Sequence, residues 1–443
     1  MYRACLVRSA LTYDFALMPD IAPPAALLER LKAELSMRPL GELVGNLTVG
    51  RCTLAGAPAH MAIVESRIAS GSIGIAEATR LGQLFRLARL EKSPVVLYLD
   101  SAGARVSEGL KALGAFRAMY RDALAAALGG TPIFAVIGRN CFGGASMLAH
   151  LARIRVLHPS AQLAMSGPSI LASAAGASAL DEMFRAMAEA ALGAAARRKA
   201  SPRNVIWDGN SILGEDVMHA ANAAQSARGW MEETFAALGS RLAKRVTAGA
   251  PESVARKDLG KCFPEGFTLS DLDGVASGEA NSGGETIGLL GILGGRPLGG
   301  ERALRLAELA WKLALERRYA RAMVLLDCES HLANLDEERA VLSEYLAALS
   351  LALGVLRATG TALETLVLGR SGGGVYVALA SPADKVSVAH GIEIQVLPGA
   401  AIASILGESR EAAPEIGDYR AAGVADEELK LGVVPEDALS KRA

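Results

Sequence analysis

Strand-length apolar runs alternate along this chain with longer stretches in which apolar residues recur at helical spacing. In the first half, the pattern predicts a helix over 76–87 and a strand over 94–99. In the second half, it predicts a helix over 301–315 and a strand over 322–326. Strands that alternate with helices of about ten or more residues are typical of β-α-β units with right-handed crossovers, so we expect an α/β protein.

The same succession of landmarks occurs twice, which indicates an internal duplication. After each of these strands comes a helix, over 110–128 or 337–358, then a strand that runs into glycines, and then a third strand followed by a proline. The separation between matching landmarks grows only from 225 (299 − 74) to 230 (398 − 168) residues. The matching pairs are Gly74 with Gly299, Asp100 with Asp327, Gly143 with Gly372, and Pro168 with Pro398. Such regularity predicts two related domains.

The length of 443 residues also exceeds what one hydrophobic core usually serves. The join is expected in a polar stretch over 247–284, which contains Gly and Pro and has no strong periodicity. We therefore predict one domain over 1–250 and another over 251–443. The first domain is expected to carry additional helices within 171–244, beyond the unit that the halves share.

The composition excludes some classes of binding partner and favours one cellular compartment. Lys and Arg number 46 against 47 Asp and Glu, so no overall charge draws the chain to nucleic acid or to an anionic membrane. The apolar runs are far shorter than the roughly 20 residues of a membrane helix, and the N-terminal stretch does not read as a signal peptide. The five cysteines lack the spacing of a disulfide framework or a zinc site, so we expect a cytoplasmic protein without a metal.

The glycines that end one strand of each half mark a candidate anion site. Gly143 and Gly144 follow a strand and open a helix, where free backbone N–H groups and the helix dipole favour negative charge. No P-loop lysine follows, so an oxyanion is favoured over a nucleotide phosphate. A second donor is expected from the loop after the preceding strand, at Gly103 and Ala104. Close packing of helix against strand is the alternative reason for such glycines.

Two segments of the first half resemble a known family. The run Asp-Ser-Ala-Gly-Ala-Arg-Val-Ser-Glu-Gly at 100–109, with Cys-Phe-Gly-Gly-Ala-Ser at 141–146, resembles the carboxyltransferase branch of the crotonase superfamily, found in acyl-CoA carboxylases and malonate decarboxylase. The first half, with its loop at 198–207, looks like the beta subunit of biotin-independent malonate decarboxylase. The second half, with Leu-Gly-Arg-Ser-Gly-Gly-Gly at 368–374, looks like the gamma subunit. The resemblance, over about 40–434, implies both subunits fused in one chain as two tandem crotonase-like domains.

The resemblance implies that the chain decarboxylates a malonyl thioester to the acetyl thioester through an enolate. A first oxyanion hole would hold the thioester carbonyl, and a facing turn would bind the departing carboxylate or carbon dioxide. The hole consists of Gly103, Ala104, Gly143 and Gly144, and the turn of Ser371, Gly372 and Gly373. An enolate held by N–H groups requires no metal and no electron-sink cofactor, so no tightly bound cofactor is expected.

The thioester carrier is expected to be coenzyme A or the phosphopantetheine-type group of an acyl carrier protein. The resemblance further implies an acyltransferase subunit as a partner, and a homo-oligomer. Glu329, Ser330 and His331 follow the strand that ends at Asp327, and His331 is the candidate among them for the donor of the proton that the carbanion takes up. A surface or packing histidine is the alternative. The chain has Cys-Glu-Ser-His at 328–331 where relatives place a glycine, which affects one donor of the second hole.

Several substrate contacts are expected around the first hole. Arg197 and Arg198 belong to a compact basic cluster with Lys199 and Arg203, which is a candidate for coenzyme A phosphates or an acidic carrier protein, or is a solvated loop. Arg105 is either a clamp for the substrate carboxylate or part of a salt bridge. The remaining predicted substrate-binding residues are Ser101, Gly71 and Gly74.

Three other functions are weighed against the decarboxylase. A biotin-dependent acyl-CoA carboxyltransferase component uses the same type of hole, and a non-catalytic partner subunit would have a decayed second hole. The segment 369–373 also fits G-x-S-x-G, the nucleophile elbow of serine hydrolases. The acid and histidine that follow it, Asp384 and His390, lie only six residues (390 − 384) apart around one strand, which disfavours a triad.

Overall fold

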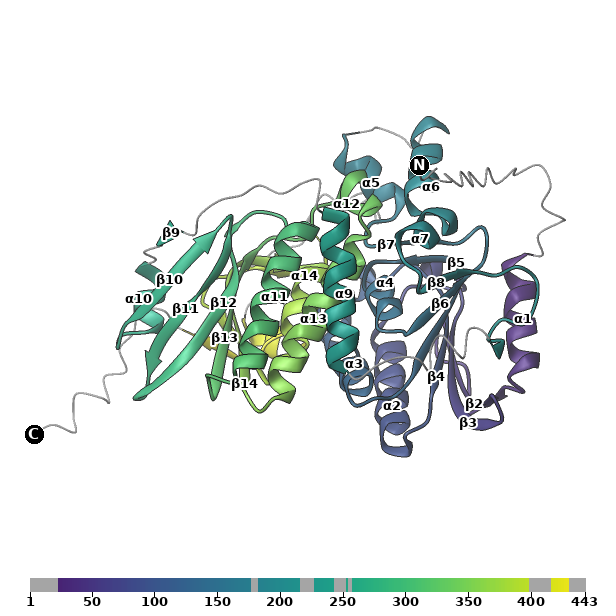
Figure 1. The fold of residues 1–443 in the computed structure, drawn as a ribbon, viewed down its shortest axis with the longest axis horizontal. Coiled ribbons are helices and arrows are strands. Elements are labelled where there is room, and N and C mark those ends of the chain that lie inside the picture. The colour runs from purple at the N-terminus through teal and green to yellow at the C-terminus, as the bar shows by residue number, and fades with distance from the viewer. Residues whose placement is uncertain are drawn as a thin grey trace, which may run out of the picture.

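The computed structural model describes residues 23–176, 182–215, 227–242, 252–253, 257–397 and 416–429. Within these ranges the chain forms two β-sheets, one of eight strands and one of nine, with helices packed against them (Figure 1). The predicted α/β class and the two tandem units are therefore confirmed. Pro398, the last landmark of the repeat, lies outside the described residues.

The first sheet has the strand order β1-β2-β3-β4-β5-β6-β8, and β7 pairs with the end of β5. β2 and β3 form an antiparallel hairpin, whereas every pairing from β3 onward is parallel. The strands are β1 (Arg38–Pro39), β2 (Leu47–Leu54), β3 (Ala57–Val64), β4 (Val95–Ser101), β5 (Ile133–Phe142), β6 (Ile154–Leu157), β7 (Gln162–Ala164) and β8 (Asn204–Ile206). The helices are α1 (Pro24–Glu34), α2 (Ile75–Glu91), α3 (Gly109–Leu128), α4 (Gly143–His150), α5 (Pro168–Ala174), α6 (Glu182–Leu192), α7 (Ala194–Ala200) and α9 (Ala227–Leu242), with 3-10 turns η2 (Ala69–Gly71) and η3 (Val106–Glu108).

The second sheet has the order β17-β15-β14-β13-β12-β11-β10-β9, and β16 pairs with the end of β14. The pairings among β9 to β12 are antiparallel and the others are parallel. The strands are β9 (Glu252–Ser253), β10 (Phe267–Leu272), β11 (Val275–Ser282), β12 (Glu285–Gly295), β13 (Arg321–Cys328), β14 (Ala362–Gly372), β15 (Lys385–Ala389), β16 (Ile394–Gln395) and β17 (Glu427–Leu429). The helices are α10 (Lys257–Cys262), α11 (Gly300–Glu316), α12 (Leu335–Arg339), α13 (Leu342–Ala358), α14 (Gly373–Ala380) and α16 (Ile416–Ala421).

The duplication is visible in how matching helices begin and end. Helix α2 follows Gly74 and is capped by Lys92, while α11 follows Gly299 and is capped by Arg317. Both capping residues have left-handed backbone, with φ of 52° and 49°. The predicted repeat thus extends from the landmark residues to the geometry of the helix ends.

One prediction at this level is wrong. In place of a single helix over 337–358, the structure has α12 and α13, which are separated at Val341 with φ of 67°. The carbonyl of Glu338, just before the break, accepts a hydrogen bond from Arg197 of the first half at 2.8 Å. The same carbonyl also accepts the Val341 N–H at 2.9 Å, so a contact between the halves lies at the turn that separates the two helices.

One hydrophobic core runs through both halves without interruption. On the first sheet, Val95, Leu97 and Leu99 of β4 face this core, while Val96 and Tyr98 belong to a second cluster that includes residues of α1. This alternation is what a strand covered on both faces requires. Figure 1 shows α3, α9 and α13 between the two sheets, so the helices of both halves share the central layer.

A close backbone approach and a buried arginine join the halves. A Cβ atom on Gly114 of α3 would lie 1.7 Å from the carbonyl oxygen of Ala422, so no larger residue fits there without a shift. Arg117, one turn further along, is buried and donates to the carbonyls of Ala380 at 3.3 Å and Gly423 at 3.1 Å. These contacts fix how the two sheets face each other.

The described strands of the first sheet end at Ile206 and those of the second begin at Glu252. The boundary at residue 250 stays a prediction. Of the additional helices expected within 171–244, the structure describes α5, α6, α7 and α9, and α9 packs on the second half, where the Tyr345 hydroxyl donates to the Leu238 carbonyl at 3.0 Å. Among the described helices, none combines the length and apolar character needed to cross a membrane.

Candidate active site

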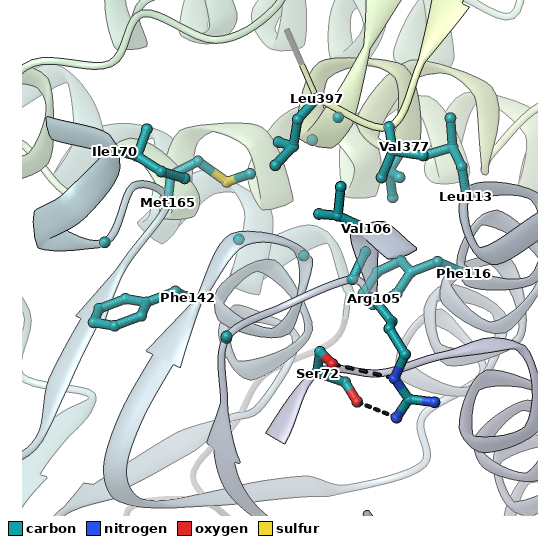
Figure 2. Close-up of a pocket in the computed structure, with 18 of the residues that line it drawn as sticks. Ser72, Arg105, Val106, Leu113, Phe116, Phe142, Met165, Ile170, Val377 and Leu397 are labelled. Carbon is teal, nitrogen blue, oxygen red and sulfur yellow. Dashed lines mark hydrogen bonds between the residues drawn. The ribbon is translucent and has the colours of Figure 1, made fainter. Parts of the chain in front are cut away.

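A cavity of about 150 Å³ lies between the two halves, at the carboxyl ends of their parallel strands. Figure 2 shows its apolar side chains, which come from both halves and gather around the same space. Prominent among them are Val106, Phe116, Phe142, Met165, Val377 and Leu397. The glycine-rich starts of α4 and α14 also line this cavity, because Gly143, Gly144, Gly373 and Gly374 are all part of its wall. The two turns that the sequence singled out thus meet at one site.

In the first half, two of the four predicted hole residues have N–H groups that are already engaged. The N–H of Gly103 donates to the Ser101 hydroxyl at 3.2 Å, and the N–H of Gly143 donates to the Met165 carbonyl at 3.1 Å. Neither group is available to a substrate in this geometry. The expectation that all four residues supply donors is corrected accordingly.

The N–H groups of Ala104 and Gly144 have no hydrogen-bond partner in the described part of the chain. The bonds from Ile73 to Gly103 and from Arg105 to Ile73 bracket Ala104 and leave its own N–H unused. Gly144 lies in the first turn of α4, where helical N–H groups have no partner within the helix. We call these two groups the first amide pair.

The two loops that carry the first amide pair are in contact. A Cβ on Gly103 would lie 2.9 Å from the Phe142 carbonyl and 3.5 Å from the Gly144 nitrogen, so the absence of a side chain allows this approach. A Cβ on Gly144 would lie 2.5 Å from the Phe116 ring. The first amide pair, with the positive end of α4 behind it, suits an oxyanion at the cavity wall.

The second half repeats this arrangement around different residues. Leu298 donates to the Ser330 carbonyl at 2.8 Å, and Leu332 donates to the Leu298 carbonyl at 2.9 Å, which brackets His331 in the way that Ala104 is bracketed. Helix α14 begins at Gly373 with φ of 55°, and α4 begins at Gly143 with φ of 56°.

Gly374 therefore corresponds to Gly144, and the N–H groups of His331 and Gly374 are without partners among the described hydrogen bonds. We call them the second amide pair. The loop at 328–331 offers an N–H group despite lacking the expected glycine, and Gly374 was missed because the sequence assignment stopped one residue short of it.

Ser371 and Gly372 do not lie on the cavity wall. The N–H of Ser371 donates to the Glu393 carbonyl at 3.1 Å, and its side chain is fully buried. A Cβ on Gly372 would lie 2.4 Å from the Gln395 carbonyl, so this glycine serves the close pairing of β14 with β16. Of the predicted second turn, only Gly373 lines the cavity, and we correct the assignment of the other two.

The structure also argues against a serine hydrolase. The Ser371 hydroxyl has no hydrogen-bond partner among the described residues, and the downstream groups are engaged elsewhere: His390 with Glu428, and Asp384 with Arg357. The described residues contain no group of three His, Cys, Asp or Glu side chains suited to a metal ion.

His331 lies in the cavity wall and belongs to a buried polar cluster. Its Nε2 atom is 2.9 Å from the Ser166 hydroxyl, and its Nδ1 atom has no partner among the described groups. The backbone N–H of Ser166 donates to Glu338 at 2.7 Å, and that of Met165 donates to the same carboxyl group at 3.1 Å. Burial lowers the pKa of His331 to about 4 and raises the pKa of Glu338 to about 7. Sequence reasoning missed Ser166 and Glu338.

Arg105 borders the cavity but directs its guanidinium away from the apolar side chains, toward Ser72 (Figure 2). It donates to the Ser72 carbonyl at 2.8 Å and to Glu108 at 2.7 Å, and it forms an ion pair with the buried Glu77. Of the two roles considered for Arg105, the structure therefore favours the salt bridge, and the carboxylate clamp is corrected.

The neighbouring predicted contacts serve the local fold. Ser101 is buried and accepts the Gly103 N–H. A Cβ on Gly71 would lie 2.0 Å from the Asp100 carbonyl, and one on Gly74 would lie 2.5 Å from Arg105, so both glycines permit close packing beneath the hole. Neither glycine lines the cavity.

The predicted basic cluster is divided by burial. Arg198 and Lys199 are exposed, as a phosphate-binding surface requires. Arg197 is fully buried and donates to the carbonyl of Glu338, so it is not available to a phosphate at the surface. Burial lowers the pKa of Arg197 to about 10, and the charge of Glu338 opposes this shift. Its position between the halves corrects the prediction that it binds substrate.

Comparison with known proteins finds a match to a protein family within the first half. Residues 36–189 match the family model of the carboxyl transferase domain. The methylmalonyl-CoA carboxyltransferase 12S subunit of Propionibacterium freudenreichii subsp. shermanii is 30% identical over 130 residues, which is 29% of this chain and 25% of that protein. The acetyl-coenzyme A carboxylase carboxyl transferase subunits beta/alpha of Salinispora arenicola are 24% identical over 467 residues, 95% of this chain and 79% of that protein.

Among solved structures, a Pseudomonas malonate decarboxylase hetero-tetramer in complex with malonate is similar, at 20% identity and a TM-score of 0.44. The similarity covers 52% of this chain and 95% of that one. The chain spans about a quarter to a half of the length of the first curated relatives that it matches, with coverage of 25%, 51% and 54%. The family match therefore rests on residues 36–189, which resemble a carboxyl transferase domain.

Proposed function

We propose, from the premise that residues 36–189 form a carboxyl transferase domain, that this chain decarboxylates a malonyl thioester to the acetyl thioester through an enolate. The observation that carries the proposal is the pair of unengaged N–H groups of Ala104 and Gly144 at the wall of the cavity between the halves. The second amide pair lines the same cavity from the other half. An anion held at one pair therefore has a second anion site close to it.

In the proposed reaction the thioester carbonyl accepts from the first amide pair. When the bond between the α-carbon and the carboxylate breaks, the electron pair moves onto the carbonyl oxygen, and the N–H groups stabilise the enolate that forms. Removing one such donor typically lowers kcat by about 10²- to 10³-fold. The small, largely apolar cavity strengthens these interactions because little water competes for the oxygen.

The substrate carboxylate is proposed to lie against the second amide pair, His331 and Gly374. Its negative charge is lost as carbon dioxide forms, so this site needs only to orient the group and not to hold it tightly. The carbanion carbon then takes up a proton, and the imidazole of His331 is the ionisable side chain of the described cavity wall best suited to supply it, because Arg105 is engaged in ion pairs. No bound cofactor is part of this proposal.

The thioester carrier is proposed to be coenzyme A or an acyl carrier protein, met at the surface by Arg198 and Lys199. An acyltransferase subunit and self-association complete the proposed partners. The fusion of a beta-like and a gamma-like half, with a boundary near residue 250, is part of the same proposal. A cytoplasmic location agrees with the cysteine usage.

Carboxyl transfer to or from biotin is the second candidate, favoured by the names of the curated relatives. The second amide pair offers the type of N–H donors that a ureido oxygen requires, so the residues fit this group as well. In that reaction the first amide pair would hold the same enolate.

One experiment separates these functions. The purified chain is incubated with malonyl-CoA, or with malonyl carrier protein, and acetyl thioester and carbon dioxide are measured with and without free biotin. The proposal expects acetyl thioester in both cases. Formation that depends on biotin would favour carboxyl transfer, and a complete absence of turnover with both carriers would favour the non-catalytic partner.

A further inference from the structure

A continuous cluster of polar side chains crosses the interface between the halves. It consists of Ser166, His331 and Glu338. Ser166 and Glu338 are fully buried, and His331 is 6% exposed at the cavity. The Ser166 hydroxyl is 2.9 Å from His331 Nε2, and it is also a hydrogen-bond partner of the Glu338 carboxyl group. These side chains thus connect a buried carboxyl group to an imidazole in the cavity wall.

The surroundings of Glu338 allow its carboxyl group to exist both with and without a proton. The backbone N–H groups of Met165 and Ser166 donate to its two oxygens and stabilise the charged form. Arg197, buried beside it on α7, also favours the charged form. Burial acts in the opposite direction and is the largest influence, so the pKa of this group rises to about 7.

The other charged groups nearby act at longer range or lie in solvent. Arg241 of α9 and Glu344 of α13 influence Arg197 in opposite directions. The charged side chains of α6, which packs against α12, are exposed: Glu182, Arg185 and Glu189. His331, on the loop before α12, is neutral near pH 7 because burial lowers its pKa to about 4.

We propose that Glu338, Ser166 and His331 form a proton relay that delivers the proton to the carbanion after carbon dioxide has left. This inference rests on the proposed function and names the source of its proton. His331 Nδ1 is buried and has no partner among the described residues, whereas Nε2 faces Ser166. Because His331 also lines the cavity, its ring lies between the cavity and the relay.

The proton balance closes within the three residues. The Nδ1–H bond of neutral His331 breaks as a C–H bond forms at the α-carbon of the enolate, whose electron pair returns from the oxygen. Ser166 transfers its hydroxyl proton to Nε2, and Glu338 transfers its carboxyl proton to the Ser166 oxygen. Glu338 is left as a carboxylate, held by the two backbone N–H groups and Arg197. Once the product has left, a solvent proton enters through the cavity and returns along the same path.

A purely structural role for the cluster is the alternative, because a buried serine and glutamate also hold two segments together. A proton relay and a structural role differ in proton exchange, which a measurement of stability does not detect. A relay exchanges the α-protons of the product thioester with solvent, since each step is reversible. It also requires the protonated form of Glu338, so its rate falls as the pH rises through the pKa of that group.

The test measures deuterium uptake into acetyl-CoA in D2O together with acetyl-CoA formation from malonyl-CoA, for the whole chain. Ser166→Ala and Glu338→Gln are compared with Ser381→Ala, which removes a buried hydroxyl that has no partner in the described chain and lies outside the cavity wall. We expect Ser166→Ala to lower both rates about 10²-fold or more, and Ser381→Ala to leave them near those of the wild type. We expect the wild-type rate to decline above about pH 7 and the rate of Glu338→Gln not to do so.

If Ser166→Ala takes up deuterium into acetyl-CoA and decarboxylates malonyl-CoA at the rates of the wild type, the relay is wrong and the proposed function still stands. A wild-type chain that neither decarboxylates malonyl-CoA nor exchanges the α-protons of acetyl-CoA would overturn both. If Glu338→Gln does not fold, Ser166→Ala alone decides, because it deletes one hydroxyl without leaving an unpaired carboxylate.

Discussion

His331 occupies in the second half the backbone position that Ala104 occupies in the first. Each residue is bracketed by the same two backbone hydrogen bonds, made through Leu298 or Ile73, and each leaves its own N–H unengaged among the described bonds. The two residues differ only in what the side chain adds. Both residues line the cavity, where Ala104 adds a methyl group and His331 an imidazole, so only one of the two matching loops carries an ionisable side chain at this position.

The first amide pair is tested at Ala104. Replacing Ala104 by proline removes the N–H group without breaking a described hydrogen bond, and we expect kcat for acetyl thioester formation to fall by about 10²-fold or more. Ala104→Val is the matched control, because it adds similar bulk and keeps the N–H. Equal losses in the two variants, at unchanged melting temperature, would mean that bulk and not the donor matters.

The other donor of this pair requires a double variant. A Cβ on Gly144 would approach the Phe116 ring to 2.5 Å, so each substitution at Gly144 is made together with Phe116→Leu. Gly144→Pro is expected to lower kcat about 10²-fold relative to Gly144→Ala in that background, because proline is tolerated in the first turn of a helix but has no N–H. Steady-state kinetics measure kcat for both double variants. Equal kcat values would contradict the assignment of the Gly144 N–H as a donor.

The second half is tested by separating the imidazole of His331 from its backbone. His331→Ala keeps the N–H of the second amide pair and removes the proton carrier, so we expect kcat to fall about 10²-fold with little change in KM. Gly374→Pro removes an N–H of the same pair and is expected to raise KM for the malonyl thioester instead. Both parameters come from initial rates over a range of malonyl-CoA concentrations, and identical effects of the two variants would argue against separate roles.

The buried carboxyl group of Glu338 should make stability depend on pH. Its pKa is raised from 4.5 to about 7, so the folded state binds this proton more tightly than the unfolded state does. Its contribution to stability is therefore fully present below about pH 4.5 and is lost as the pH rises through about 7. The difference in unfolding free energy between wild type and Glu338→Gln should fall by about 3 kcal/mol across this range.

Urea unfolding at pH 4.5, 6 and 8 measures this difference. His331 shifts in the opposite direction, with its pKa lowered to about 4, but it is present in both proteins and its effect cancels in the comparison. A difference that stays constant with pH would show that the Glu338 carboxyl group is not protonated in the folded state.

Arg105 is expected to matter for stability more than for substrate affinity. Arg105→Ala leaves the buried Glu77 without its ion-pair partner, which should cost about 3 kcal/mol. Burial alone would raise the pKa of Glu77, but hydrogen bonds from Arg105 and the backbone lower it, so this stabilisation is present above about pH 4.5 and is lost as the pH falls. A large rise in KM at unchanged melting temperature would instead restore the carboxylate clamp.

The sequence was sufficient to predict the duplicated α/β architecture and, at Gly143, Gly144 and Gly373, part of the glycine-rich turns that line the cavity from both halves. Periodicity and the regular spacing of landmarks are local properties, and they survive divergence of the side chains. The donors within each turn were less predictable. Which N–H groups stay free depends on the Ser101 hydroxyl and the Met165 carbonyl, and neither contact follows from spacing.

Contacts across the seam could not be predicted from the sequence at all. Ser166 and Glu338 are 172 residues apart and meet only because the helices of both halves share one core. The burial of Arg197 has the same origin, since in sequence it is indistinguishable from its exposed neighbour Arg198. Gly374 was missed by one residue, because the spacing paired Gly143 with Gly372, whereas the helix starts pair Gly143 with Gly373 and so Gly144 with Gly374, an offset of 230 residues (374 − 144).

The uninterrupted core between the halves has a consequence for how acyl groups enter and leave. Separating the two sheets would expose apolar surface on both and would break the close packing of Gly114 against Ala422. We therefore expect the two units not to open and close around the substrate. Acyl groups therefore have to reach and leave the cavity while the two sheets stay packed against each other.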